Sequence, residues 1–244
     1  MKKFVVLSVL SFGLLGINQS QANILFSTNF NGYANGNIVG QDNWAAHSGS
    51  GSLPVQVVNG AFVLNQGSGS REDVNHGLGA TMGAGDTWYY SFDVSVSGGN
   101  TSVYFAMFLQ GTTIFDGRLY VTSFSGSDFT FGIGGSSLGP TWASGFSFNT
   151  VNKIVVSYDY TSKNATLWVN PTSSGSTSIT YNTGYSDAVT AIAFRQAAGN
   201  SVETIDNLVV GTTFNDVVPV PEPSTVALGL VGGLAGLVAL RRKR

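Results

Sequence analysis

The chain has 244 residues, a formal net charge of −2 at pH 7 and no cysteine. The absence of cysteine excludes disulfides, thiol nucleophiles and zinc sites with cysteine ligands. Stability must therefore come from the burial of apolar surface alone.

The N-terminal segment has the pattern of a secretory signal peptide. Two lysines precede a run rich in apolar residues (residues 4–17), and a short polar stretch ends at the small residue Ala22. Such a run is too short for a stable membrane span, and a small residue suits signal peptidase. We therefore expect residues 1–22 to be a signal peptide that is cut between Ala22 and Asn23.

The next segment, residues 23–217, is acidic and long enough for one domain. Between residues 23 and 220, five basic residues stand against twelve acidic ones, a formal charge of −7. This charge argues against nucleic acid and anionic membrane surfaces as partners, because both attract clustered lysine and arginine. No long linker divides the segment, so we expect a single domain over residues 23–217.

Apolar and polar side chains alternate in this segment, which predicts β-strands with one buried face. The clearest case is residues 87–96, where Trp88 and Tyr90 share the apolar face. Turn residues at 97–100 and a second apolar run at 103–109 follow, and we expect the two strands to form a hairpin. Further strands are expected at residues 53–58, 62–65, 117–124, 129–133, 153–160, 165–170, 191–195 and 204–210.

This pattern of elements predicts the fold class. Many short strands with Gly-rich turns and no long amphipathic helix between them specify two antiparallel sheets packed face to face. We expect an all-β, antiparallel two-sheet jelly-roll sandwich, flanked by the N-terminal signal peptide and a C-terminal transmembrane helix.

Four local segments occur in an order that is similar to a known group of folds. They are Phe30-Asn31-Gly32-Tyr33, Phe115-Asp116-Gly117, Ile154-Val155-Val156-Ser157-Tyr158-Asp159 and Ile205-Asp206-Asn207-Leu208-Val209-Val210-Gly211. This order resembles the laminin-G-like and concanavalin-A-like jelly rolls. The resemblance implies that the first and last strands lie together. It also implies that Asp206 joins main-chain carbonyls around a structural calcium ion, with Asn29 or Asn31 as a further oxygen ligand. The alternative is that Asp206 only accepts hydrogen bonds from backbone amides.

No set of catalytic carboxylates stands out in the sequence. Glycoside hydrolysis normally needs two carboxylates on either side of the sugar bond, and the only glutamates are Glu72, Glu203 and Glu222. The densest polar cluster is Arg71-Glu72-Asp73 with His76. A lyase could use such a cluster as base and neutraliser, and a charged turn between strands explains the same residues.

Residues 135–139 match the Gly-x-Ser-x-Gly pattern of a serine nucleophile. Pro140 follows at once, and both histidines, His47 and His76, precede the serine. The hydrolase fold needs a helix after this motif and a histidine later in the chain. We therefore expect no catalytic residues.

Exposed aromatic rings are the candidates for glycan binding, because sugar rings stack on them. Trp142 and Trp44 lie in Gly/Ser-rich, loop-like contexts, and Trp168 lies on the strand face opposite its apolar neighbours. We expect these three to form stacking sites, or else to be buried in the core of the sandwich.

The C-terminal segment, residues 218–244, has three parts. They are the motif Val220-Pro221-Glu222-Pro223-Ser224-Thr225, an uncharged apolar run at 226–240, and the basic end Arg241-Arg242-Lys243-Arg244. The parts and their order resemble the PEP-CTERM sorting signal. That resemblance implies a Gram-negative bacterium that makes exopolysaccharide, and a membrane-embedded exosortase that cleaves near the motif. The apolar run is short for a permanent span, so we expect a disposable address that holds the protein in the inner membrane only transiently.

Together these patterns predict an exported protein of the cell surface or extracellular matrix. We expect it to be non-enzymatic, processed by an exosortase-type system, associated with extracellular polysaccharide and free of nucleic acid. The alternatives are a carbohydrate-binding, lectin-like module and, third, a polysaccharide hydrolase or lyase.

Overall fold

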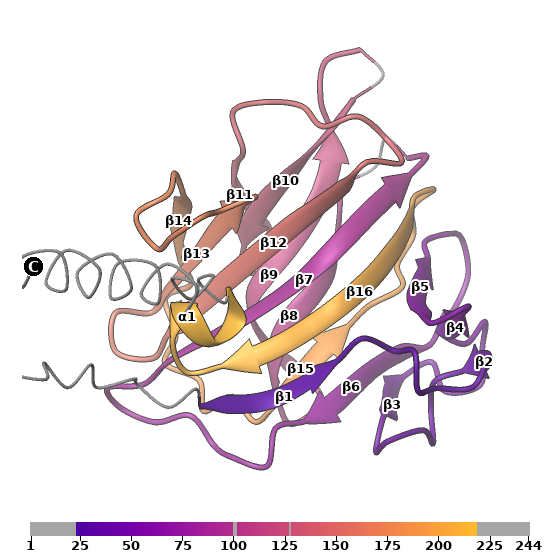
Figure 1. The fold of residues 1–244 in the computed structure, drawn as a ribbon, viewed down its shortest axis with the longest axis horizontal. Coiled ribbons are helices and arrows are strands. Elements are labelled where there is room, and N and C mark those ends of the chain that lie inside the picture. The colour runs from indigo at the N-terminus through magenta and orange to yellow at the C-terminus, as the bar shows by residue number, and fades with distance from the viewer. Residues whose placement is uncertain (1–22, 100–101, 127, 219–244) are drawn as a thin grey trace, which may run out of the picture.

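The computed structural model describes residues 23–99, 102–126 and 128–218 as two antiparallel sheets packed face to face (Figure 1). Within these residues the only helix is the single turn α1, Phe214–Val217. The predicted all-β, two-sheet class is confirmed.

The first sheet has nine strands in the order β14-β13-β12-β7-β16-β5-β4-β2, and β1 also pairs with β16. Their bounds are β1 Ile24–Thr28, β2 Gly36–Asn37, β4 Gln56–Val58, β5 Ala61–Asn65, β7 Thr87–Ser97, β12 Val151–Asp159, β13 Asn164–Val169, β14 Ile179–Asn182 and β16 Val202–Gly211.

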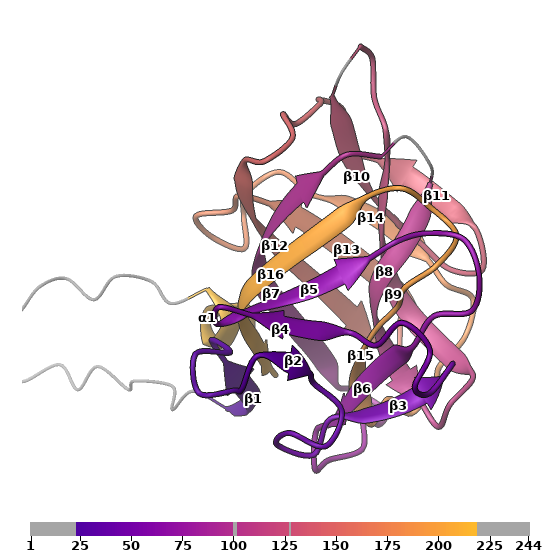
Figure 2. The same cartoon turned by 90° about the vertical axis from the view of Figure 1, so that its right-hand side faces the viewer.

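The second sheet has seven strands in the order β11-β10-β9-β8-β15-β6-β3. Their bounds are β3 Ala45–Ser48, β6 Asp73–Gly77, β8 Val103–Gln110, β9 Ile114–Ser123, β10 Phe129–Gly134, β11 Leu138–Thr141 and β15 Ala191–Phe194. Figure 2 shows the side of the molecule at which β2, β4 and β5 of the first sheet lie beside β3 and β6 of the second.

The expected hairpin of residues 87–96 and 103–109 is wrong. The first of these strands, β7, pairs with β12 and β16, whereas the second, β8, pairs with β9 and β15 in the other sheet. The chain therefore crosses from one sheet to the other after Ser97. Turn residues and an apolar strand on each side are common to hairpins and to such crossings, so the local pattern does not distinguish them.

The core fills the space between the sheets and is rich in aromatic side chains. The alternation predicted for residues 87–96 is confirmed, because Trp88, Tyr90, Phe92, Val94 and Val96 all face the core. The largest fully buried side chains include Phe30, Phe62, Phe105, Phe108, Phe129, Phe131 and Phe194. Burial of one such side chain stabilises a fold by about 2 kcal/mol, so this layer holds the sheets together without disulfides.

The first and last strands lie together, as the resemblance implied. Both β1 and β5 pair with β16 on the edge opposite β7: β5 takes the segment from Val202 to Ile205, and β1 the segment from Leu208 to Gly211. The backbone N–H of Asn23 donates to Asp216 Oδ1 of α1 at 3.2 Å. The two ends of the described chain therefore meet at one side of the sandwich (Figure 1).

Candidate functional site

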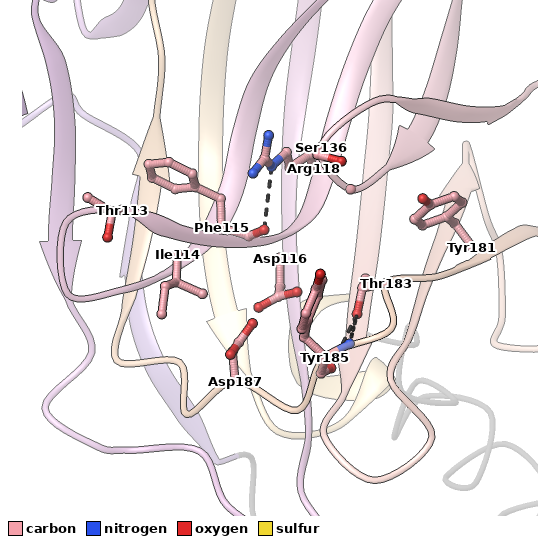
Figure 3. Close-up of a pocket in the computed structure, with 11 residues that line it drawn as sticks. Thr113, Ile114, Phe115, Asp116, Arg118, Ser136, Tyr181, Thr183, Tyr185 and Asp187 are labelled. Carbon is pink, nitrogen blue, oxygen red and sulfur yellow. Dashed lines mark hydrogen bonds between the residues drawn. The ribbon is translucent and has the colours of Figure 1, made fainter.

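A cavity of about 340 Å³ lies where an edge of the first sheet approaches the second. It is formed by the start of β9, the turn between β10 and β11, strand β14 and the loop that leads to β15 (Figure 3). Its lining residues are Thr113, Ile114, Phe115, Asp116, Arg118, Gly135, Ser136, Tyr181, Thr183, Tyr185 and Asp187. We call it the tyrosine cavity.

Two tyrosines give the cavity its aromatic surface. Tyr185 is 70% exposed, and its main-chain carbonyl accepts a hydrogen bond of 2.7 Å from the hydroxyl of Tyr158. Tyr181 packs against Gly135 and Gly139 of the β10–β11 hairpin, where a Cβ atom would meet its ring. The ring of Tyr181 can lie there because these two positions carry no side chain.

Two carboxyl groups, from Asp116 and Asp187, lie next to each other at the wall of the cavity (Figure 3). A β-bulge sets the position of Asp116: Ala106 pairs with Leu119 but Phe108 pairs with Asp116, which leaves one extra residue in β9. Gly117, at φ 56°, supplies the left-handed backbone that such a bulge favours.

Asp116 is 3% exposed, and within the described residues its Oδ2 atom has no hydrogen-bond partner. Burial, and next the hydrogen-bonding contact with Asp187, raise the pKa of Asp116 to about 8. On the other side, the N–H of Asp187 donates to the hydroxyl of Tyr158 at 3.0 Å. Near neutral pH Asp116 therefore keeps its proton, and its carboxyl group can both donate and accept a hydrogen bond.

This arrangement suits the binding of a sugar better than its hydrolysis. A hydrolase holds its two carboxyl groups about 5 Å or more apart, so that the glycosidic bond fits between them. Asp116 and Asp187 are instead in direct contact. The sequence patterns missed this pair because the two aspartates lie on segments that only the tertiary fold brings together.

Two of the three tryptophans expected to stack on glycan are buried. Trp44 is 2% exposed and packs in the core between Phe26 and Phe62. Trp168 lies on the outer face of the first sheet, as its position in the strand indicates, but α1 covers it and leaves it 8% exposed. Neither offers a ring face to a ligand, so both expectations are corrected. Trp142 is half-buried against the core and does not line the tyrosine cavity.

Asp206 lies at the point of β16 where the edge partner changes from β5 to β1. A second bulge places it there, with Asn207 at φ 53°, and Asp206 Oδ1 accepts the N–H of Asn207 at 2.7 Å. The side chain of Asn31 lies against Gly60, in the turn that precedes β5.

A calcium ion at this junction stays a prediction. Within the described residues, no group of three or more His, Asp or Glu side chains is placed to hold a metal. Calcium accepts main-chain carbonyls as ligands, so Asp206 fits such a site only if carbonyls and Asn31 supply the other oxygens.

The polar cluster around residues 71–76 is a buried network and not a charged turn. Asp73 Oδ1 accepts the N–H of Gln196 at 2.9 Å, and Glu72 Oε2 accepts the N–H of Gly51 at 2.9 Å. The ring of His76 stacks on Phe26 at 3.7 Å, and burial lowers the pKa of this histidine. These side chains hold neighbouring loops and strands together.

The Gly-x-Ser-x-Gly segment forms the turn between β10 and β11 and the start of β11. No helix follows it, so the serine does not sit on a strand-to-helix elbow, as the sequence context predicted.

Other sequence predictions concern residues outside the described part of the chain. They are the signal peptide up to Ala22, the motif at 220–225, the apolar run at 226–240 and the basic end at 241–244. Among the residues that the structure does describe, no helix is long and apolar enough to cross a membrane.

Comparison with solved structures supports the sandwich fold. A protein titled "Sialidase" superposes with a TM-score of 0.55 at 15% identity, over 80% of this chain and 19% of that chain. This chain thus spans about a fifth of that protein's length. Lectin II from Ulex europaeus has a TM-score of 0.49 at 14% identity, over 76% of this chain and 97% of the lectin. A lectin from Bauhinia forficata has a TM-score of 0.47 at 14% identity, over 77% and 97%. At 15% identity, the likeness to the first of these proteins shows the fold alone.

No curated protein matches the chain significantly. The family comparison concerns the C-terminal end, where residues 219–244 match the PEP-CTERM protein-sorting motif. The chain therefore carries the sorting signal that its sequence resembles, and this signal implies export and processing by an exosortase.

Proposed function

We propose that this chain is an exported protein of a Gram-negative bacterium, processed by an exosortase-type system and released to the cell surface or extracellular matrix. There its sandwich domain binds exopolysaccharide without cleaving it. The sorting motif at residues 219–244 supports the destination. The observation that carries the binding function is the tyrosine cavity.

The cavity combines the groups that recognise sugars. The exposed ring of Tyr185 and the ring of Tyr181 offer apolar faces for the C–H surface of a pyranose. The hydroxyls of Ser136 and Thr183, with the carboxyl pair, can exchange hydrogen bonds with sugar hydroxyls. A volume of about 340 Å³ is in the range of small-ligand sites.

The test is the substitution Tyr185→Ala, measured by affinity electrophoresis in gels that contain exopolysaccharide of the producing cells. Because stacking contributes about 1.4 kcal/mol, we expect affinity to fall about tenfold while the melting temperature stays unchanged. Val151→Ala is the matched control, since Val151 is 65% exposed and lies at the opposite end of β12 from Tyr158. Equal loss in both variants, or no saturable binding by the natural chain, would contradict the proposal.

A further inference from the structure

A pair of arginines lies on the outer face of the second sheet, beside the tyrosine cavity. Arg118 of β9 and Arg195, the residue after β15, both lie over the ring of Tyr104 from β8. The guanidinium carbons are 4.7 Å and 4.3 Å from the centre of this ring. Arg118 also lies 5.2 Å from the ring of Phe115. Stacking on aromatic rings holds both cations in place before any ligand arrives.

The charge of these two arginines is only weakly compensated. Arg195 Nε lies 4.0 Å from Asp73 Oδ2, at the outer limit of an ion pair. Arg118 Nε donates a long hydrogen bond of 3.4 Å to the carbonyl of Phe115, and in the described part of the chain it makes no ion pair. By contrast, Lys153 lies 2.8 Å from Asp93 on the other sheet.

The neighbouring carboxyl pair does not cancel this charge. Since Asp116 keeps its proton near neutral pH, the two aspartates together carry less negative charge than two free carboxylates. Each guanidinium group therefore keeps its attraction for an anionic ligand.

The two arginines line two neighbouring cavities, one arginine in each. A second cavity of about 310 Å³ adjoins the tyrosine cavity, and Ser136 lines both. Arg118 lies in the first cavity, whereas Arg195, Tyr104 and Tyr120 lie in the second. A ligand that occupies both cavities must therefore pass the two guanidinium groups, which a polymer does and a single sugar does not.

We propose that this surface binds an acidic polysaccharide, with uronate carboxylates at Arg118 in one cavity and at Arg195 in the other. The inference rests on the proposed glycan-binding function and specifies its ligand class. The planar guanidinium group matches a carboxylate, because it can donate two parallel hydrogen bonds to the two carboxylate oxygens.

The test compares polygalacturonate with its fully methyl-esterified form, which has the same backbone without the charge. We expect the natural chain to bind polygalacturonate about tenfold more tightly. The double variant Arg118→Gln/Arg195→Gln should lose this preference and keep its affinity for the ester. The double variant Lys153→Gln/Lys163→Gln changes the net charge equally, away from the arginine pair, and should keep the preference.

Each outcome separates this inference from the proposed function. Equal binding of both polymers by the natural chain, or equal loss of preference in the two double variants, overturns the acidic ligand and leaves glycan binding intact. Failure of the natural chain to bind either polymer or exopolysaccharide overturns both. If the arginine variant does not fold, the natural chain decides: its preference should fade between about 0.05 M and about 0.5 M salt, and a salt-independent preference contradicts the inference.

Discussion

Among the described residues, Glu203 of β16 is a titratable side chain that is fully buried. Its Oε2 atom accepts a hydrogen bond of 2.8 Å from Gln66 Nε2, and its Oε1 atom is buried without a partner in the described part of the chain. Burial raises the pKa of Glu203 from 4.5 to about 7. The folded state therefore keeps a proton that the unfolded chain releases above pH 4.5, so stability is greatest below this pH and falls as the pH rises to about 7.

Replacement by Glu203→Gln should weaken this dependence, and the raised pKa of Asp116 contributes to what remains. A neutral amide keeps the acceptor for Gln66 and needs no proton, so we expect the variant to be more stable than the natural chain above pH 7, by at most roughly 3 kcal/mol. Thermal unfolding between pH 5 and pH 8 measures the effect, a window that spans the raised pKa of about 7. If the stability of the natural chain and that of Glu203→Gln change equally with pH over this window, Glu203 is not the group responsible.

At the scale of the elements, the β10–β11 hairpin forms the surface on which the ring of Tyr181 packs. A Cβ atom at Gly139 would overlap the Tyr181 ring and approach the carbonyl oxygen of Ile133 to 2.7 Å. We expect Gly139→Ala to destabilise the domain by about 1–3 kcal/mol and to weaken glycan binding, because the ring must move. Gly77→Ala is the control, since a Cβ at Gly77 meets nothing within 4 Å. Unchanged melting and affinity in Gly139→Ala would contradict this role of the hairpin.

The elements also show where sequence patterns succeed and fail. Period-two alternation located β7, β12 and β16 because each strand has one face against the core. It missed β3 and β6, whose sequences Ala-Ala-His-Ser and Asp-Val-Asn-His-Gly lack that pattern. It placed Trp168 on the correct face but could not show that the four residues of α1 cover it.

At the scale of the whole molecule, the fold class followed from composition, but the site did not. Short strands and Gly-rich turns are enough to predict a sandwich, since few architectures bury such strands. The tyrosine cavity joins Asp116 of β9 to Asp187 of a loop in another part of the chain, and Tyr104 meets Arg195 across β8 and β15. Such pairs depend on the order of strands in the two sheets. Because the chain crosses from one sheet to the other after Ser97, local sequence patterns could not give this order.

The junction of the two chain ends yields a prediction about maturation. Cleavage after Ala22 would turn the Asn23 N–H that contacts Asp216 into a positively charged amine beside a buried carboxylate. We expect protein that begins at Asn23 to be more stable, by about 1 kcal/mol, than protein that retains Ala22. Thermal unfolding of the two forms measures this difference. In the control variant Asp216→Asn the two forms should melt together, and equal melting in the natural sequence would contradict the prediction.

The position of β16 has a mechanical consequence for a protein held in a polymer matrix. The C-terminal segment follows β16 and α1, so before exosortase cuts it, drag on captured polysaccharide would load the domain at that strand. β16 is hydrogen-bonded along both edges, to β7 on one side and to β5 and β1 on the other. A strand held in this way cannot peel off as an edge strand does, so force must break several ladders before the domain unravels.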